Sequence, residues 1–299
     1  MDRGHHSRRL TCRSVLRMNG VTDKPGITLA CCGLIGTLVA DEGLVERSFA
    51  EAIATQGVVS GTSAFARRMS QVYQARGHSG ADVLRLLFPD NEARAQAAQL
   101  AFDRALADAI GRVAIQPVPG AVQVLEQLRA AGISVSILTS LPRRVLDRVL
   151  DTAGLGCRID LALSAEDVPR GFPAPDLVLM SVMRTGTWSV GEVAVIHGTG
   201  AGVEGGRRSG AGIVAGVLTG PHSAQRLRSA GATHILKSIA DLPGIVQAGD
   251  AAVHRDAPTA SDNGDAGRIK PAERGTVQAN PASVDVPAQA PFEGRTLGR

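Results

Sequence analysis

The chain has few aromatic residues and almost no lysine. Aromatic side chains make up 3% of its 299 residues, although 44% of the residues are hydrophobic. A core of this composition is built mainly from Ala, Val, Leu and Ile, and the chain is long enough to bury one. The only lysines are Lys24, Lys237 and Lys270. Without a basic face interleaved with aromatic residues, the sequence predicts no nucleic-acid partner.

Cysteine and long apolar runs are scarce as well. Cys12, Cys31, Cys32 and Cys157 show no CxxC spacing and no disulfide framework, which favours a reducing compartment. The apolar run at residues 27–39 is too short for a membrane span, which needs roughly 18 residues. We therefore expect a cytoplasmic protein that has no membrane partner.

The two ends of the chain differ in composition from the middle. Residues 1–26 carry six Lys or Arg against two Asp, which equals the formal charge of +4 for the whole chain. This segment lacks the apolar block of a signal peptide, so it is either a flexible basic arm or an over-extended start with initiation at Met18. Residues 248–299 are rich in Ala, Pro, Asp, Gly and Ser, and we expect a disordered tail.

The middle of the chain alternates between short apolar strands and amphipathic helices. Residues 27–32 form an apolar run that stops at a glycine-bounded turn, as expected of a strand buried on both faces. Similar runs occur at 133–138 and 193–196, and amphipathic helices are predicted at 121–131 and 143–153. This order predicts an α/β fold in which helices flank a parallel sheet, with a core formed by residues 27–40 and 116–247.

Residues 41–115 have a helical period instead. Leu44, Val45, Phe49 and Ile53 lie on one face of a helix expected at 42–55. Further helices are expected at 65–74, after a cap at Ser79, and at 91–110. We expect an all-α subdomain inserted after the first strand.

A glycine-rich stretch after the strand at 193–196 has the form of a nucleotide-binding motif. Residues 200–205 fit G-x-G-x-x-G, but no acidic residue stands about 20 positions further on, and the strand is not the first of the fold. Anion binding by backbone N–H groups at this helix start is the better interpretation.

Four stretches together carry a family signature. They are the turn Gly33-Leu34-Ile35-Gly36-Thr37 after the first strand, the strand end Thr139-Ser140, the loop Gly171-Phe172-Pro173-Ala174-Pro175-Asp176, and the stretch from His197 to Gly206. In this order they resemble the motifs of the haloacid dehalogenase-like hydrolase superfamily, in particular its phosphonatase-like members. The resemblance runs from about Ile27 to Ile245. It implies a parallel α/β core, with the helical insertion as a cap over the site.

The same resemblance implies phosphoryl transfer, and the residues that perform it are replaced. The family has an aspartate nucleophile, often a second aspartate as general acid, a phosphate-binding Lys or Arg, and two metal-binding aspartates. This chain has, in that order, Gly33, Ile35, Phe172, Gly198 and Gly202. No side-chain ligand for Mg²⁺ remains at these positions, so we expect no metal and no cofactor. Four residues remain as a candidate anion pocket: Thr139, Ser140, Thr199 and His197.

Several nearby residues are candidate replacements for these lost groups. Arg170 lies two positions before Phe172, where the family has its cation. A shift of two residues in a loop points a side chain in another direction, so Arg170 is not expected to replace that cation. Cys32 points to the opposite strand face from residue 33, where core packing is favoured over nucleophilic chemistry. His197 is a candidate base or weak ligand, although a lone histidine is more often structural. The remaining candidates are carboxylates: Asp41, Glu42 and Glu204. The Schiff-base lysine of phosphonoacetaldehyde hydrolases is excluded, because no lysine lies between Lys24 and Lys237.

These observations lead to one hypothesis and two alternatives. The first is a catalytically degenerate member of the family that binds a small anionic ligand or a protein partner. The second is an active Mg²⁺-dependent phosphatase or phosphonatase-like hydrolase with a rearranged site. The third is an interaction module that acts through its terminal segments. Sequence does not identify the ligand or the oligomeric state.

Overall fold

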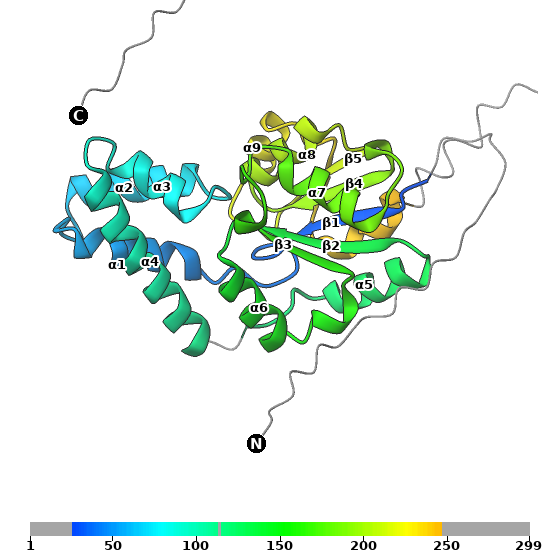
Figure 1. The fold of residues 1–299 in the computed structure, drawn as a ribbon, viewed down its shortest axis with the longest axis horizontal. Coiled ribbons are helices and arrows are strands. Elements are labelled where there is room, and N and C mark those ends of the chain that lie inside the picture. Colours follow the sequence, from blue (N-terminus) through cyan, green and yellow to red (C-terminus); the bar gives the residue numbers. More distant parts are fainter. Residues whose placement is uncertain (1–25, 113–114, 247–299) are drawn as a thin grey trace, which may run out of the picture. The chain divides into compact units, whose positions relative to one another are not determined.

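The protein is built on a six-stranded sheet in which all strands are parallel. The computed structural model describes residues 26–112 and 115–246. The strand order is β3-β2-β1-β4-β5-β6, so the first strand of the chain lies between β2 and β4 (Figure 1). The strands are β1 (Leu29–Gly33), β2 (Ser134–Thr139), β3 (Leu161–Ser164), β4 (Val193–His197), β5 (Ile213–Val217) and β6 (His234–Leu236).

Helices cover both faces of this sheet. The helices of the α/β layer are α5 (Ala121–Ala130), α6 (Arg143–Thr152), α7 (Asp176–Thr185), α8 (Gly200–Ser209) and α9 (Ala224–Ser229). Helices α5 and α6 pack on one face, and α7 and α8 pack on the other (Figure 1). Four short 3-10 helices complete the layer: η1 (Gly156–Arg158), η2 (Ala165–Asp167), η3 (Val190–Glu192) and η4 (Ile239–Asp241). The predicted fold class is confirmed.

Between β1 and β2 the chain forms four consecutive helices, here called the insertion. They are α1 (Leu44–Thr55), α2 (Ser63–Gln74), α3 (Gly80–Leu87) and α4 (Glu92–Arg112). They pack around their own aromatic contact, because the rings of Phe49 and Phe102 are stacked at 4.1 Å. The insertion and the sheet belong to one compact unit, and Figure 1 shows the insertion beyond the carboxyl ends of the strands.

Two helix starts differ from the sequence prediction for local reasons. Helix α1 begins at Leu44 rather than residue 42, because Gly43 precedes it in the left-handed region at φ 72°. Helix α2 begins at Ser63 rather than residue 65, because the Thr62 side chain accepts the Phe65 N–H as an N-cap. The predicted arm and tail lie outside the described residues, and the division into core and cap stays a prediction.

The strands alternate between the two faces, as buried parallel strands require. In β1, Leu29 and Cys31 face α7, while Ala30 and Cys32 face the side that carries α5. Cys32 is fully buried, as expected, and burial raises the pKa of its thiol. The pKa of Cys31 is raised to about 12 for the same reason. Both thiols are therefore protonated core residues and not nucleophiles.

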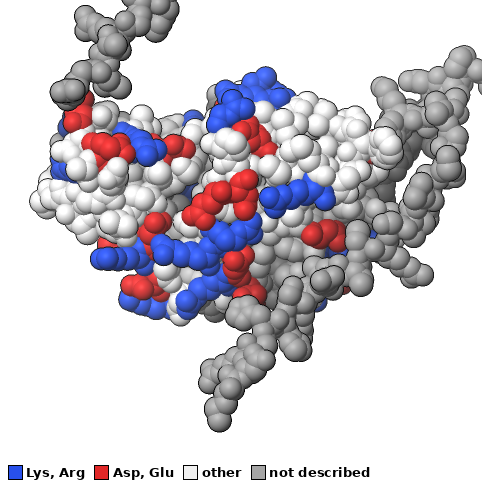
Figure 2. Space-filling view, viewed as in Figure 1, with Lys and Arg blue, Asp and Glu red and all other residues white. Residues whose placement is uncertain are grey.

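Charged side chains of both signs are interspersed on the face shown in Figure 2. Arg144 pairs with Asp103 at 3.6 Å, which joins α6 to α4, and Arg143 pairs with Asp147 at 3.7 Å. The expectation of no nucleic-acid partner stays a prediction. Among the helices of the described ranges, none combines the length and the apolar content that crossing a bilayer would require.

Candidate functional site

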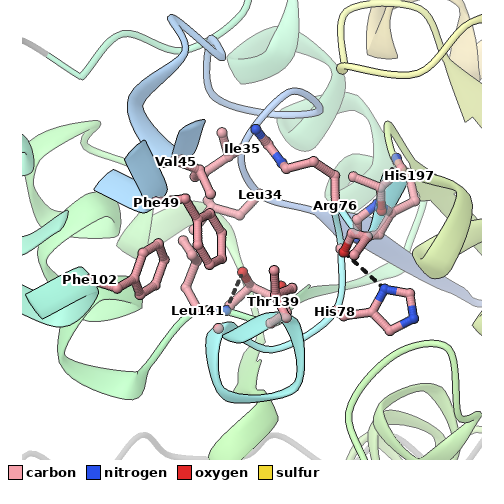
Figure 3. Close-up of a pocket in the computed structure, with 16 residues that line it drawn as sticks. Leu34, Ile35, Val45, Phe49, Arg76, His78, Phe102, Thr139, Leu141 and His197 are labelled. Atoms are coloured by element: carbon pink, nitrogen blue, oxygen red, sulfur yellow. Dashed lines mark hydrogen bonds between the residues drawn. The ribbon is translucent and has the colours of Figure 1, made fainter. Parts of the chain in front are cut away.

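A narrow pocket lies where the carboxyl ends of β1, β2 and β4 meet the insertion (Figure 3). It holds about 40 Å³ of space, which suffices for about three water molecules. The insertion contributes mainly apolar residues: Val45, Phe49, Ala75, Arg76, Gly77, His78, Gly80, Val83 and Phe102. The sheet side contributes Leu34, Ile35, Thr139, Ser140, Leu141, His197 and Thr199.

The four residues predicted for the anion pocket thus line one space. Of the five substituted family positions, only Ile35 lines it with them; Gly33, Phe172, Gly198 and Gly202 do not. Parallel strands deliver their carboxyl ends to one sheet edge, which is the reason these distant residues meet.

His197 ends β4 and is 6% exposed. Its Nδ1 accepts the Thr199 N–H at 3.2 Å and contacts the Thr199 hydroxyl at 3.0 Å. The ring proton therefore lies on Nε2, which is buried and has no hydrogen-bond partner. Burial lowers the pKa of His197 to about 4, with further lowering by His222 and Arg76. The imidazole is neutral at pH 7.

The His197 ring fills the space into which side chains at the nearest substituted positions would project. A Cβ on Gly33 would lie 2.9 Å from both Cδ2 and Nε2 of His197. A Cβ on Gly202 would lie closer than 3.0 Å to three atoms of the same ring. Where the resembled motif begins Gly-Asp-Thr, this chain has His197-Gly198-Thr199. An imidazole therefore stands where the motif has glycine, and glycines stand where it has aspartates.

The position of the third lost carboxylate is closed by backbone. A Cβ on Gly198 would lie 2.8 Å from the Gly220 Cα and 2.8 Å from the Gly36 carbonyl oxygen. The Gly198 N–H donates to the Thr37 hydroxyl at 3.0 Å, which holds the turn after β1 against the turn after β4. An aspartate at residue 198 requires this junction to move.

Phe172 replaces the phosphate-binding cation with aromatic packing. The side chain is 1% exposed, and its ring meets the His197 ring edge-on at 5.2 Å and 79°. Gly205 of α8 leaves room for it, since a Cβ there would lie closer than 3.0 Å to the Phe172 ring. Arg170 does not take over: it forms hydrogen bonds of 2.9 and 3.1 Å with Asp176, and its side chain is 73% exposed.

Mg²⁺, which the resemblance to the family implies, does not fit this arrangement. Mg²⁺ needs hard oxygen ligands at about 2.1 Å in octahedral geometry. The three positions that supply carboxylates in the resembled motifs are glycines, and a neutral imidazole and a phenyl ring occupy the adjoining volume. Across residues 26–112 and 115–246, no group of three His, Cys, Asp or Glu side chains is arranged to hold a metal.

Two N–H groups at the start of α8 already have acceptors. Gly200 N–H donates to His222 Nδ1 at 2.8 Å, and Gly202 N–H donates to the Thr199 hydroxyl at 3.3 Å. The anion binding that the sequence suggested for this helix start therefore competes with two intramolecular hydrogen bonds.

The loop between α2 and α3 supplies pocket residues that sequence reasoning missed. Arg76 is 5% exposed and pairs with Asp41 at 2.7 Å and with Glu46. The next residue, Gly77, has φ 96° and packs so closely on Thr199 that a Cβ would collide with it. The only signal was an Arg-Gly-His break between two helical patterns. Asp41 is thus the partner of a buried arginine.

Comparisons with known proteins agree with this architecture. The chain is 37% identical over 106 residues to phosphonoacetaldehyde hydrolase of Bordetella pertussis, an alignment that covers 35% of this chain and 38% of the relative. It is 27% identical over 154 residues to phosphonoacetaldehyde hydrolase of Salmonella typhimurium, with 44% and 57% covered. The alignments thus span less than two thirds of these relatives.

Solved structures share the fold over a longer stretch. A phosphonoacetaldehyde hydrolase like protein from Oleispira antarctica superposes with a TM-score of 0.69 at 20% identity, covering 81% of this chain and 99% of that one. A hydrolase from Pseudomonas syringae gives a TM-score of 0.65 at 23% identity, with 74% and 98% covered. The family model of the haloacid dehalogenase-like hydrolases matches residues 30–210, more than half of the chain. The chain belongs to the haloacid dehalogenase-like hydrolase superfamily.

Proposed function

We propose that this protein is a non-catalytic member of its family that binds a small anion in the pocket between the insertion and the sheet. The observation that carries the proposal is the His197 ring, which fills the space that side chains at residues 33 and 202 would enter. Removal of a nucleophile alone slows other hydrolases by about 10⁴–10⁶. In this chain the residues at and beside the substituted positions also pack against one another, because Phe172 contacts the His197 ring and that ring fills the space beside Gly33 and Gly202.

The charges around the pocket disfavour a multiply charged ligand. Thr139, Ser140 and Arg76 line the pocket. Two carboxylates, Asp41 and Glu46, already pair with this arginine. Because the local charge is not positive, a phosphate dianion is held less well than a carboxylate or a phosphonate monoester.

Ligand titration of the full-length protein tests the binding proposal. Acetate, methyl methylphosphonate and inorganic phosphate are followed by isothermal titration and by the amide NMR signals of residues 139–141. We expect a monoanion to shift these signals, and Ser140→Ala to weaken binding about 10- to 100-fold, as for loss of a hydrogen bond to a charged group. Thr187→Ser, outside the pocket, is the control. Signals that stay unchanged for all three anions contradict the proposal.

The alternative is a Mg²⁺-dependent hydrolase with a rearranged site, favoured by the names of the aligned relatives. Wild-type protein with Mg²⁺ is assayed against phosphonoacetaldehyde and a panel of phosphate esters. Turnover abolished by EDTA overturns the non-catalytic proposal. A restored variant (Gly33→Asp, Phe172→Lys, Gly198→Asp and Gly202→Asp) needs His197→Gly as well, because the ring occupies the space of two of these side chains.

A protein partner in place of an anion is a further possibility. Deletion of residues 1–17 or 248–299 distinguishes the two, since it removes partner binding through the terminal segments and leaves anion binding unchanged.

The three cysteines in the described ranges are free thiols, which supports our proposal of a cytoplasmic protein.

A further inference from the structure

The pocket between the insertion and the sheet has a polar side and an apolar side. Figure 3 shows Phe49 and Phe102 on one side and His197 on the other, with Thr139 between them. The two phenyl rings stack at 4.1 Å, and Val83 of α3 lines the same pocket. A molecule that fills this space therefore meets two unlike surroundings.

The polar side has hydrogen-bond donors that are left for a ligand. His197 Nε2–H is buried and has no hydrogen-bond partner within the part of the chain that the structure describes. The Thr139 hydroxyl oxygen accepts the Leu141 N–H at 3.2 Å, so its own hydrogen remains for another acceptor. A buried donor without a partner is costly, and an acceptor oxygen of a ligand removes that cost. This side matches the oxygens of a carboxylate.

The apolar side has no hydrogen-bonding side chain to offer. Val45, Phe49, Val83 and Phe102 carry only hydrocarbon and are nearly fully buried. A methyl group placed against them gains free energy by leaving water. A hydroxyl group in the same place loses its hydrogen bonds to water without replacement. This side therefore favours a hydrocarbon group over a hydroxylated one of equal size.

The size of the pocket limits the length of the ligand. Its 40 Å³ of space corresponds to about three water molecules, which have about the volume of a molecule with four or five non-hydrogen atoms. Acetate and propionate have this size, and a sugar phosphate is much larger. The limit agrees with the charge argument, which disfavours a multiply charged ligand.

We propose that the pocket binds a short aliphatic monocarboxylate of the size of acetate or propionate. The carboxylate accepts from His197 Nε2–H and from the Thr139 hydroxyl, and the hydrocarbon end packs against Phe49 and Val83. The inference rests on the proposed anion-binding function and adds the chemistry of the uncharged end of the ligand. The insertion then selects the ligand because it offers no polar partner there.

Propionate and glycolate form a matched pair that tests this selection. Both are monoanions at pH 7 with five non-hydrogen atoms, and they differ by a methyl group in place of a hydroxyl group. Each is titrated into the full-length protein and followed by calorimetry and by the ¹⁵N NMR signal of His197 Nε2. We expect propionate to bind about 10- to 100-fold more tightly than glycolate and to shift the Nε2 signal.

A substitution in the apolar side should weaken the preference. Val83→Thr introduces a hydroxyl of nearly the same volume, which can pair with the hydroxyl of glycolate. We expect the ratio of the two affinities to fall by about 2- to 10-fold, as for one neutral hydrogen bond. Val72→Thr is the control, because Val72 is a fully buried valine of the insertion that does not line the pocket. It should keep the wild-type ratio.

The outcomes separate this inference from the function on which it rests. Glycolate that binds as tightly as propionate overturns the inference, and so does an Nε2 signal that stays in place while propionate binds. If inorganic phosphate binds and neither acid does, the anion pocket stands and the inference fails. If none of the three binds, both fail. Should Val83→Thr not fold, the two wild-type titrations decide.

Discussion

Two buried histidines, His197 and His222, lie near each other at the sheet edge and differ in the hydrogen bonds that their ring nitrogens form. His197 uses one ring nitrogen, leaves the other unpartnered, and fills space between glycines. His222 uses both nitrogens and joins two elements. The family positions around His197 have become a packed region, whereas the insertion contact around His222 is a hydrogen-bonded region. Substitutions in the first should therefore act through volume, and those in the second through unsatisfied polar groups.

The largest effect is expected in the hydrogen-bonded region, at Arg76. Arg76→Met leaves the buried Asp41 and the partly buried Glu46 without their partner, and loss of one member of a buried ion pair costs about 3–5 kcal/mol. Urea unfolding measures the change. The control is Arg85→Met. The side chains of Arg85 and its partner Glu92 are both more than half exposed, so loss of this pair should lower the unfolding free energy by under about 1 kcal/mol. Equal costs at the two sites would contradict this assignment.

At Gly202, we expect the volume of an added side chain to determine the change in the free energy of unfolding. Gly202→Ala places a methyl group against the His197 ring, and overpacking of this kind costs about 1–3 kcal/mol, in excess of the helix propensity gained. Gly200→Ala in the same helix is the control, since its nearest neighbour would be 3.5 Å away. Adding His197→Gly should remove the clash, and a double-mutant cycle by thermal unfolding measures the coupling. Additive effects would mean that the ring does not fill this space.

The protonation of His197 should be visible as acid destabilisation. Its pKa is about 4 in the folded protein, below the ordinary 6.5, so the unfolded chain binds more protons in this window. The unfolding free energy is therefore retained above pH 6.5 and falls as pH drops toward 4, by up to about 1.4 kcal/mol per pH unit. His197→Leu should reduce this slope when both proteins are compared in the His222→Gln background. A pH dependence of the unfolding free energy that is unchanged in His197→Leu would show that another group titrates in this range.

The smallest effect is expected at Tyr73, between the insertion and the core. Tyr73→Phe removes the hydroxyl that donates to the Pro221 carbonyl and keeps the ring beside His222. A single hydrogen bond of this kind contributes about 0.5–1.5 kcal/mol. We expect the free energy of unfolding to fall by about this amount, as measured by urea unfolding. An unchanged unfolding free energy would show that this bond does not stabilise the contact between the insertion and the core.

The sequence was sufficient to predict features that depend on local pattern. Strand runs and helix periods predicted the parallel α/β fold, and the ends of parallel strands must meet, which is why Thr139, Ser140, His197 and Thr199 could be grouped. The helix starts at Leu44 and Ser63 were each predicted two residues away, because the backbone conformation of Gly43 and the capping by Thr62 decide them.

Other features depend on contacts between distant residues. The partners of Arg76 lie 30 and 35 positions away, and those of His222 lie 22 and 149 positions away. No periodicity links such pairs. That His197 fills the room left by Gly33 and Gly202 is a statement about volume, which a motif compared one position at a time does not contain.

The place of β1 in the sheet has a consequence for the order of assembly during synthesis. Leu29 pairs with Ser134 on one side and with Val193 on the other, so the first strand emerges long before either neighbour. The insertion, by contrast, is made of consecutive helices whose contacts are close in sequence, and such contacts form fast. We expect the insertion to collapse first on the ribosome, while the apolar strand beside it waits exposed and in need of protection from aggregation.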